Sequence, residues 1–522
     1  MLVDAREMAS ESHVHADICI IGAGAAGITL AREFANTNLK VCLMESGGFD
    51  LDLATQNLYK GSSTGWPYWP LEGSRIRFFG GTTNHWGGNC IPLNEDDFLS
   101  REWVPNSGWP LSKRELMPYY ESAQSLFGLG RYSYDPSDWE TPSRRVMHFN
   151  GQSIVSKMFQ NCRQKRFGSV YRDELVNSTN IHLYLYANAI DISANPAVNK
   201  VDSVRFACLN GGRFTVSATT YLLALGGIEN SRILLASNKQ QKNGLGNTND
   251  VVGRYFSDHY YFSNTGLMVV PDPKTGLDLY DRKRRAKNQK IGVHFELSAK
   301  VRREDKLLST RIHLSQVPWK AYSRDKGAPV VKRGYQDRIA DKLTSLLGRI
   351  EQPSKLDKNS ALSYGEPGRA RLFSVGLWSE VLPRAESRIK LNESRDAFGM
   401  PRVTFDWKIG STEKQSVMES LSYFARQVGA NGIGRVRVDL DEASPWPWVG
   451  GGEPGLHQMG GTRMSDNPGK GVVDKNCRVH GLTNLYVAGS SVFPTFGTAN
   501  PTLTIVALAL RLAKHIKSKM HE

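Results

Sequence analysis

Residues 17–27 read DICIIGAGAAG, a short apolar run that leads into Gly22, Gly24 and Gly27. A continuous apolar run is typical of a strand that is buried on both faces, and apolar residues at helical spacing follow over residues 28–34. In such a strand–turn–helix unit the first glycine makes the turn, the second lets a pyrophosphate approach the backbone, and the third lets helix and strand pack closely. Because phosphates bind well at a helix N-terminus, the segment predicts a dinucleotide-binding turn.

A second strand is predicted at residues 40–44, where KVCLM leads directly into Glu45. Since a right-handed crossover joins parallel strands, the two strands begin a parallel sheet. Glu45, at the end of the second strand, is placed to accept hydrogen bonds from an adenosine ribose. Further strand–turn units at residues 221–227 and 485–489 each precede a predicted helix, the second of them over residues 501–517. One parallel-sheet domain is therefore expected to be assembled from three separated stretches, and strands at 375–391 and 402–407 are expected in an antiparallel sheet.

The composition indicates a globular protein. The 522 residues are 40% hydrophobic and 22% charged, which suggests roughly three folding units of ~150 residues and excludes disordered and collagen-like chains. No apolar run approaches the ~18–20 residues that span a membrane. Residues 1–16 lack the apolar core of a signal peptide, and six cysteines lie far apart without a C-x-x-C pair. We therefore expect a reduced, cytoplasmic protein with no transmembrane segment.

The positive charge is concentrated in one region. The net charge is +15, and residues 271–350 hold 20 Lys+Arg against 9 Asp+Glu. The basic block at 282–287 is typical of a solvated surface loop, while binding of nucleic acid or anionic lipid is the alternative. A basic amphipathic helix is predicted at 335–352, with packing in the core or on a partner favoured over contact with a membrane surface. No nucleic-acid partner is expected.

Several further segments contain unusual combinations of glycine, histidine and asparagine. They are GGTTNHWGG at 80–88, ALGGIENSR at 224–232, VGRYFSDH at 252–259, SRIKL at 387–391, HQMGGT at 457–462 and ANPTLT at 499–504. In these segments the sequence resembles the glucose–methanol–choline (GMC) flavoprotein oxidoreductases. The resemblance runs in family order from about residue 16 to 517, and it is most like the pyranose oxidase branch.

The resemblance implies an α/β fold with FAD as the cofactor. It implies a Rossmann-like FAD-binding domain built from discontinuous segments, plus a substrate domain with a largely antiparallel sheet. The expected boundaries are 14–100, 200–262 and 452–518 for the FAD-binding domain, 101–199 for connecting and lid segments partly in both domains, and 263–451 for the substrate domain with the basic insertion 271–350.

The resemblance also implies which residues are catalytic. When FAD oxidises an alcohol, a hydride leaves carbon for flavin N5 while a base removes the hydroxyl proton. His457 matches the family position of that base, and an imidazole titrates near neutral pH as a base must. Asn500 matches the partner position, where it would hydrogen-bond the substrate oxygen and orient it.

The remaining implied contacts concern the cofactor. His85 falls where several family members attach the flavin 8α-methyl carbon to histidine; a hydrogen bond to a noncovalent flavin is the alternative. Pro501 and Thr502 begin a helix whose N-terminus points at the flavin in the family, where its partial positive charge favours an anion. The other expected cofactor residues are Gly81, Thr82, Asn84, Ala189 and Gly489, besides Gly22, Gly24, Gly27 and Glu45.

Aromatic residues crowd the predicted site. They are Trp66, Tyr68, Trp69 and Trp86 on one side, and Trp446 and Trp448 ahead of the base. Sugar rings stack on aromatic planes, so oxidation of a hydroxyl of a sugar, glycoside or amino-sugar to a carbonyl is expected; aromatic packing of a flavin lid is the alternative. Dehydrogenases that pass electrons to a quinone or cytochrome, and GMC-type lyases, would have similar sequences. The electron acceptor is O₂ or such a partner, a homo-oligomer remains open, and no metal site is expected.

Overall fold

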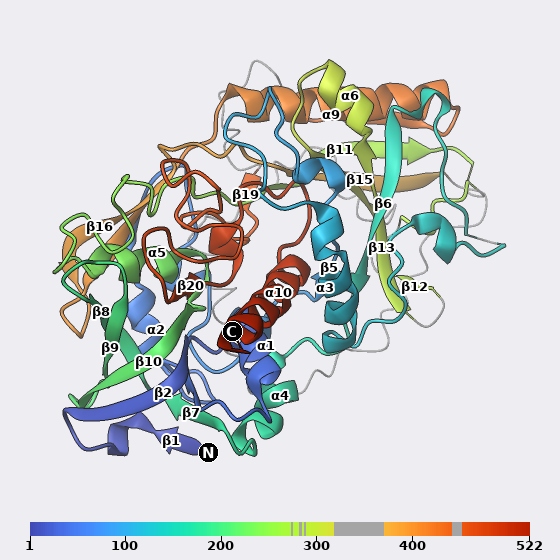
Figure 1. Cartoon of the computed structure of the whole chain (residues 1–522). Helices are drawn as coiled ribbons and strands as arrows, with labels where there is room; N and C mark the ends of the chain where they lie inside the picture. Colours follow the sequence, from blue (N-terminus) through green and yellow to red (C-terminus); the bar gives the residue numbers. More distant parts are fainter. Residues whose placement is uncertain are drawn as a thin grey trace.

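The computed structural model describes residues 1–142, 144–272, 275–280, 284–286, 289–317, 370–440 and 452–521. This part of the chain forms a mainly parallel sheet, a larger antiparallel sheet and a small third sheet. The two large sheets lie on either side of helix α10 (Thr502–His521), at the lower left and upper right of Figure 1.

The mainly parallel sheet is built around the strand of the glycine motif. Across the sheet the strands are β1 (Leu2–Asp4), β7 (Ile181–Leu185), β3 (Val41–Met44), β2 (Ser12–Ile21), β10 (Arg213–Leu223), β9 (Val201–Ala207) and β8 (Asn188–Ala194), and β20 (Leu485–Val487) also pairs with β10. Strands β1, β7, β3, β2 and β10 pair in parallel with their neighbours in this order, and β20 is parallel to β10. Strand β9 pairs antiparallel with both β10 and β8. Residues 18–21 are almost completely buried. The Rossmann-like fold predicted from the motif is confirmed.

Strand β10 shares one edge between two neighbours. Its residues 213–216 pair antiparallel with β9, and its last residues, 221–223, pair in parallel with β20. Its other edge pairs with β2 along residues 214–223, apart from one position. The carboxyl ends of β2, β10 and β20, which come from distant parts of the sequence, therefore lie side by side.

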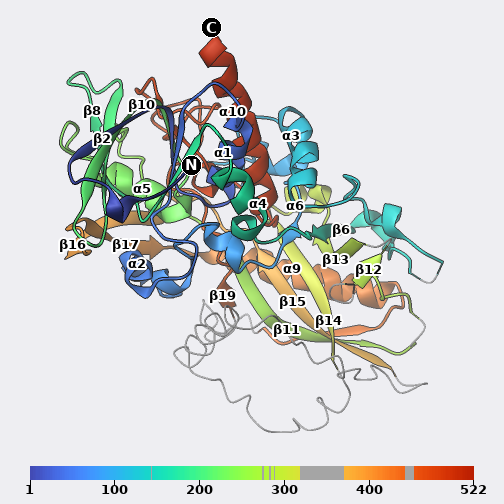
Figure 2. The ribbon, with the colours of Figure 1, turned by 90° about the horizontal axis from the view of Figure 1, so that it is seen from below.

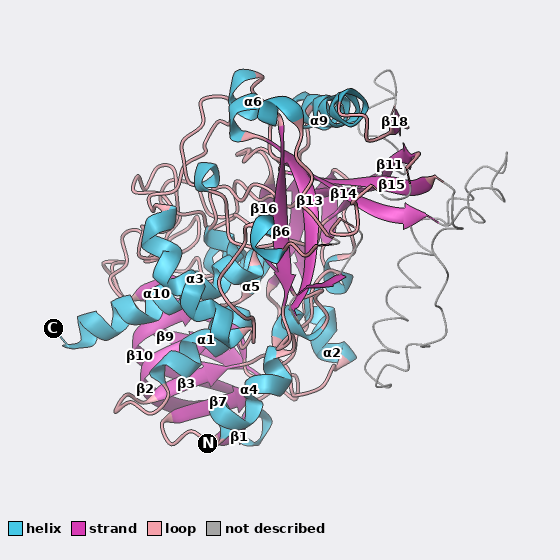
Figure 3. Ribbon diagram, turned by 90° about the vertical axis from the view of Figure 1, so that its right-hand side faces the viewer, coloured by secondary structure: helices cyan, strands magenta, loops and turns pink. Residues whose placement is uncertain are grey.

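Helices cover this sheet (Figure 3). Helix α1 (Ala25–Phe34) packs against α10, and α10 packs against α3 (Lys113–Leu126), while α4 (Phe167–Val176) contacts α1 and β7. The buried face of α10 includes Leu503, Val506, Ala507, Leu510 and Ala513. This spacing is that of an amphipathic helix packed on a core. The helix begins at Thr502, one residue after the predicted start at Pro501, and extends past the predicted end at residue 517 to His521.

The antiparallel sheet forms a second core. Its strands run in the order β18 (Arg435–Val438), β11 (Tyr260–Val270), β15 (Arg371–Ser379), β14 (Thr310–Val317), β13 (Gln289–Leu297), β6 (Ile154–Asn161) and β5 (Asn89–Cys90), with β12 (Arg284–Ala286) beside β13 and β19 (Gly452–Pro454) beside β11. Helix α9 (Ser411–Ala430) lies along this sheet, as Figure 2 shows. It buries Val417, Leu421, Phe424 and Val428, one helical face, in the second core. Two short helices, α2 (Leu53–Gln56) and α6 (Ala299–Glu304), are also present.

The third sheet corrects one expectation. Residues 375–391 and 402–407 were expected to form strands of one antiparallel sheet, but only β15 belongs to the large one. Strand β16 (Arg388–Arg395) pairs antiparallel with β17 (Pro401–Trp407), and β17 pairs in parallel with β4 (Ser62–Gly65). Both β16 and β17 contact α5 (Gly226–Ala236). Between β15 and β16, Glu380 forms a buried ion pair with Arg101, and Pro383 offers no N–H to a strand ladder. These features separate two strands that look continuous in the sequence.

Some expectations fall outside what the structure describes. The side chains of 282–287, the helix expected at 335–352, and Trp446 and Trp448 lie outside the described residues. None of the described helices is long and apolar enough to cross a membrane. All six cysteines are free and buried. The domain boundaries stay a prediction; within 101–199, β6 joins the antiparallel sheet while β7 and β8 join the parallel one.

Candidate active site

A cavity of about 470 Å³ lies beyond the carboxyl ends of β2, β10 and β20 and extends to β15 of the antiparallel sheet. Ligands of open parallel sheets bind at such an edge. Most of the predicted site residues line it: Gly22, Gly24, Glu45, Gly81, Thr82, His85, Ala189, His457, Gly489, Asn500, Pro501 and Thr502. Residues from both ends of the sequence are thus brought to one cavity.

The glycines of the cavity have two different functions. A Cβ atom added at Gly24, Gly226 or Gly489 would meet no heavy atom within 4 Å, so these residues leave space for a ligand. A Cβ atom at Gly22 would lie 2.6 Å from the Ala224 carbonyl oxygen, and one at Gly27 would lie 1.8 Å from the Gly22 carbonyl oxygen. Gly27 therefore packs helix against strand, as the motif predicted, and does not line the cavity.

Three helix N-termini meet at this cavity. Helices α1, α5 and α10 all begin with residues of its wall, and neither Gly24 nor Leu225 caps its helix with a side chain. Uncapped N–H groups and the positive ends of the helix dipoles favour an anion such as a diphosphate. The open glycine turns and this positive potential fit the FAD that the sequence implies.

Glu45 is buried at the end of β3, where the sequence placed it. Its Oε2 accepts a hydrogen bond from the Ala23 N–H at 2.9 Å, and its Oε1 accepts one from the Gly47 N–H at 3.0 Å. A carboxylate has about four acceptor sites, so Glu45 retains acceptor capacity toward the cavity. Its contact with an adenosine ribose stays a prediction.

The loop that carries His85 crosses the dinucleotide turn. The Gly80 N–H donates to the Ala23 carbonyl oxygen at 2.8 Å, and a Cβ atom at Gly81 would lie 3.1 Å from the Gly24 Cα. His85 follows the short turn and lines the cavity. Asn84, also expected to contact the cofactor, lies outside this cavity, because its side-chain amide donates to the Phe79 carbonyl oxygen at 2.9 Å and holds the turn.

His457 and Asn500 meet at the cavity wall. The Asn500 Nδ2 lies 3.2 Å from the His457 Nε2, although the two residues come from separate loops. The Trp378 ring, from β15, stacks over the His457 ring with 5.0 Å between centroids and 26° between planes. Trp378 also lines the cavity but was not predicted, since its sequence position shows only a strand residue.

Two buried residues lie behind this pair. The His259 Nδ1 is 2.8 Å from the His457 Nδ1, and the His259 Nε2 is 3.0 Å from the Gly497 carbonyl oxygen. The Arg311 guanidinium donates to the Asn500 Oδ1 at 3.3 Å. Burial, and then the positive charge of Arg311, lower the pKa of His457 to about 3. The imidazole of His457 is therefore neutral at ordinary pH and has a free lone pair, but its pKa lies well below the near-neutral value that the sequence predicted for the base.

Asp258 brings a third titratable group to the same place. Ligand atoms of Asp258, His259 and His457 all lie within 4.8 Å of one another, a proximity that the sequence did not reveal. However, the Asp258 Oδ1 accepts from the His457 backbone N–H at 2.8 Å and its Oδ2 accepts from the Tyr68 hydroxyl at 2.5 Å. Burial raises the pKa of Asp258 to about 7. Since its oxygens are engaged, and 2.8 Å between the two Nδ1 atoms is a hydrogen-bond length, the geometry favours a hydrogen-bonded network over a metal site.

The aromatic residues expected near the substrate are only partly at the cavity. Tyr68 and Trp69 are buried in the second core, where the Tyr68 ring packs on Phe405 with 4.7 Å between centroids. Trp66 packs edge-on against Tyr260. Trp86 lines the cavity as expected. Tyr68 and Trp69 therefore pack in this core and do not line the cavity, whereas packing of a flavin lid stays a prediction.

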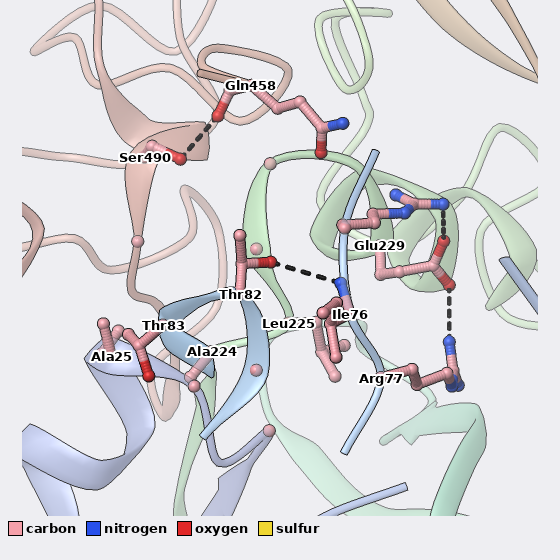
Figure 4. Close-up of a pocket in the computed structure, with 18 of the residues that line it drawn as sticks. Ala25, Ile76, Arg77, Thr82, Thr83, Ala224, Leu225, Glu229, Gln458 and Ser490 are labelled. Atoms are coloured by element: carbon pink, nitrogen blue, oxygen red, sulfur yellow. Dashed lines mark hydrogen bonds and ion pairs between the residues drawn. The ribbon is translucent and has the colours of Figure 1, made fainter. Parts of the chain in front are cut away.

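A buried ionic cluster, missed in the sequence, lines another part of the cavity (Figure 4). Glu229 lies 3.0 Å from Arg75, 3.5 Å from Arg77 and 3.1 Å from Arg232, and Arg232 also pairs with Asp396 at 2.6 Å. Burial alone would raise the pKa of Glu229, but the three guanidinium groups lower it to about 2. Three cations and two anions leave one net positive charge here. No periodicity marks such a cluster in the sequence, because its members come from distant segments.

Comparisons with known proteins support the family resemblance found in the sequence. Residues 383–509 match the GMC oxidoreductase family model. The chain is 25% identical to 6'''-hydroxyparomomycin C oxidase of Streptomyces lividus, over 97% of this chain and 92% of that protein. It is 24% identical to the fructose dehydrogenase large subunit of Gluconobacter japonicus, over 98% and 100%. Pyridoxine 4-oxidase from Mesorbium loti has a similar fold, with a TM-score of 0.55 and 17% identity over 96% of this chain and 99% of that one. The C-terminal part of the chain is therefore similar to the GMC oxidoreductases, and relatives that align over nearly the whole chain are named as an oxidase and a dehydrogenase.

Proposed function

We propose that this enzyme oxidises a hydroxyl group of a sugar, glycoside or amino-sugar to a carbonyl, with His457 as the base and Asn500 as the residue that positions the alcohol. The observation that carries the proposal is the approach of the His457 Nε2 and the Asn500 Nδ2 to 3.2 Å at the wall of the FAD cavity. A substrate hydroxyl placed between these two atoms could donate its proton to the His457 Nε2 while its oxygen accepts a hydrogen bond from the Asn500 Nδ2.

FAD, when bound, supplies the acceptor for the hydride that leaves the substrate carbon. The chain itself provides the proton acceptor and the orientation. The His457 Nε2 takes the hydroxyl proton, and the Asn500 Nδ2 donates a hydrogen bond to the oxygen that becomes negative. Because Arg311 donates to the Asn500 Oδ1, its positive charge polarises the amide toward that oxygen.

A sugar-like substrate is supported by two kinds of evidence. Trp86 and Trp378 both line the cavity, and Trp378 stacks directly on the base, so an aromatic plane stands next to the reacting hydroxyl. Among relatives aligned over nearly the whole chain, one is named for 6'''-hydroxyparomomycin C and another for fructose. The second of these is a dehydrogenase, so transfer of electrons to an acceptor other than O₂ is the alternative.

The test is an anaerobic visible spectrum of the purified holoenzyme during addition of pyranosides, amino-sugars and non-sugar alcohols. Bleaching of the flavin bands by a sugar supports the proposal, and recovery of the bands in air, with H₂O₂, identifies an oxidase. Slow recovery in air but fast recovery with a quinone or cytochrome c identifies a dehydrogenase. Bleaching only by non-sugar alcohols overturns the substrate assignment, and a stable yellow protein with every alcohol leaves the lyase alternative.

Covalent attachment of FAD through His85 is the first prediction. The wild-type holoenzyme is expected to keep its yellow colour in an acid-precipitated pellet, because a covalent bond survives unfolding. The His85→Ala variant is expected to release FAD into the supernatant while still binding it in the folded state through the remaining cavity wall. Absorbance of the supernatant and flavin fluorescence in denaturing gels measure both. Release of FAD from the wild type would contradict the covalent bond.

The second prediction concerns pH. Since the pKa of His457 lies at about 3, the base is unprotonated above that value, and kcat/KM is expected to show no acid-side loss from this group between pH 8 and 5. The Arg311→Met substitution removes one of the two causes of the low pKa of His457. The acid limb of the kcat/KM–pH profile should therefore move to higher pH, but it should stay below pH 6.5 because His457 remains buried. Arg311→Lys keeps the charge and serves as the matched control. A wild-type acid limb near pH 6.5 would refute this account of His457.

A further inference from the structure

His259 occupies a position that the proposed reaction does not use. It is completely buried, it is not part of the cavity wall, and its imidazole lies between the Gly497 carbonyl oxygen and His457. The backbone fixes that carbonyl: Gly497 has φ of +52°, and a Cβ atom there would lie 2.2 Å from the Asp97 Oδ1. The partner of His259 is therefore held in one place.

The hydrogen-bond partners assign the protons of both imidazoles. A carbonyl oxygen can only accept, so the His259 Nε2 must carry the proton of the 3.0 Å contact with Gly497. Burial keeps His259 neutral by lowering its pKa well below the usual value, so its Nδ1 has a free lone pair. The 2.8 Å contact between the two Nδ1 atoms then requires His457 to donate. Neutral His457 must consequently have its lone pair on Nε2, the atom at the cavity.

The other side of the site agrees with this assignment. A guanidinium can only donate, so Arg311 identifies the Asn500 atom next to it as Oδ1. The Asn500 Nδ2 therefore faces the His457 Nε2 as a donor, which demands an acceptor on the imidazole. Two independent contacts, one from His259 and one from Asn500, give the same tautomer.

We propose that His259 is a positioning residue that holds the proton of His457 on Nδ1 and so keeps the Nε2 lone pair directed at the substrate hydroxyl. The inference rests on the proposed function, because it assumes that His457 is the base. In the step, the hydroxyl O–H bond breaks, its electron pair stays on oxygen, and an N–H bond forms on Nε2. The His259 Nδ1 then accepts from the cationic ring, which it orients before and after the transfer.

The charged and titratable groups around the two rings do not replace His259. Asp258 binds the backbone N–H of His457 and the Tyr68 hydroxyl. Arg311 faces both rings and is positive, so it offers no acceptor. Without His259, only the Asn500 Nδ2 still favours a lone pair on the His457 Nε2, so a larger fraction of His457 carries its proton on Nε2, where the proton would block the reaction.

The kinetic test compares His259→Leu with His259→Asn in the holoenzyme. Leucine removes the acceptor, and kcat is expected to fall by about 10²-fold or more with little change in KM, since loss of an orienting partner of a catalytic histidine costs up to about 10⁴-fold. Asparagine places Oδ1 near the position of the imidazole Nδ1, and it should restore most of kcat. His480→Leu is the matched control: the His480 Nε2 lies 2.9 Å from the Ser465 carbonyl oxygen, and His480 does not line the cavity, so kcat should be unchanged.

A second measurement does not depend on turnover. In ¹⁵N-histidine-labelled holoenzyme, the His457 signals, assigned by their absence in His457→Ala, should report protonated Nδ1 and bare Nε2. In His259→Leu they should report a mixture of tautomers or protonated Nε2. A wild-type His457 protonated on Nε2, or a stoichiometric metal ion found by elemental analysis of active enzyme, would overturn the proposal. If His457→Ala is inactive while His259→Leu equals the wild type in kcat, only this inference fails; if His457→Ala stays active, the proposed function itself fails.

Discussion

Replacement of His457 by alanine is expected to slow substrate-driven bleaching of the flavin by about 10²- to 10⁴-fold, the usual contribution of a general base. The protein should remain yellow, because His457 is one of many residues in the cavity wall. Without the imidazole, the substrate hydroxyl has no acceptor beside Asn500, whose Nδ2 can only donate. Stopped-flow spectroscopy under anaerobic conditions measures the rate of bleaching directly.

Asn500 and His480 supply the comparisons. The Asn500→Ala variant keeps the base and loses only the orienting hydrogen bond, so a smaller loss of rate is expected than for His457→Ala. The His480→Ala variant removes a histidine that contacts the Ser465 carbonyl oxygen outside the cavity, and its rate should equal that of the wild type. Bleaching by His457→Ala at a rate near that of the wild type would show that another group accepts the proton.

Substitution of Gly27 by alanine is expected to remove FAD from the purified protein and to destabilise the fold by about 3 kcal/mol or more, the upper range for overpacking. The new Cβ atom would lie 1.8 Å from the Gly22 carbonyl oxygen, and this contact is with backbone that cannot rotate away. Helix α1 would have to move from β2, and the turn between them would lose its shape. The thermal unfolding midpoint and the ratio of flavin to protein absorbance measure the two effects.

Gly24→Ala is the matched comparison within the same motif. A Cβ atom at Gly24 meets no protein atom within 4 Å, and Gly24 has ordinary negative φ, so the apoprotein should keep its wild-type stability. The methyl group instead enters the space that FAD needs, and affinity for FAD should fall by about tenfold or more, equivalent to ~1.4 kcal/mol. Equal losses of stability in the two variants would contradict the separate functions assigned to Gly24 and Gly27.

The sequence predicted well what depends on neighbouring residues. The strand of residues 17–21, its glycine turn and Glu45 are consecutive features of one βαβ unit, and the structure has them as expected. The family resemblance named His457 and Asn500, and the structure brings both to the cavity. Asn84, which the resemblance also named, lies outside this cavity, because its side-chain amide donates to the Phe79 carbonyl oxygen; its contact with the cofactor stays a prediction.

Contacts between distant segments could not be predicted in this way. His259 lies one residue before β11 and appears in the sequence only as the end of a motif, with nothing to indicate that it meets His457. Arg311 and Trp378 occupy strand positions that look like ordinary sheet residues. Their places at the site follow from the pairing of β14, β15 and β11, which is a property of the tertiary fold.

The pairing of β20 with the carboxyl end of β10 has a consequence for how the enzyme is made. The turn at Gly489 and the start of α10 complete the cavity, and both are synthesised after almost all of the chain has left the ribosome. A nascent chain that already has the glycine motif of β2 lacks one wall of the cavity, so stable FAD loading must await the synthesis of β20 and the start of α10. Until then β20 cannot pair with β10, and this pairing is slow to form because the two strands are separated by a long stretch of sequence. Supply of FAD late in biosynthesis, rather than early, is therefore expected to limit the yield of active enzyme.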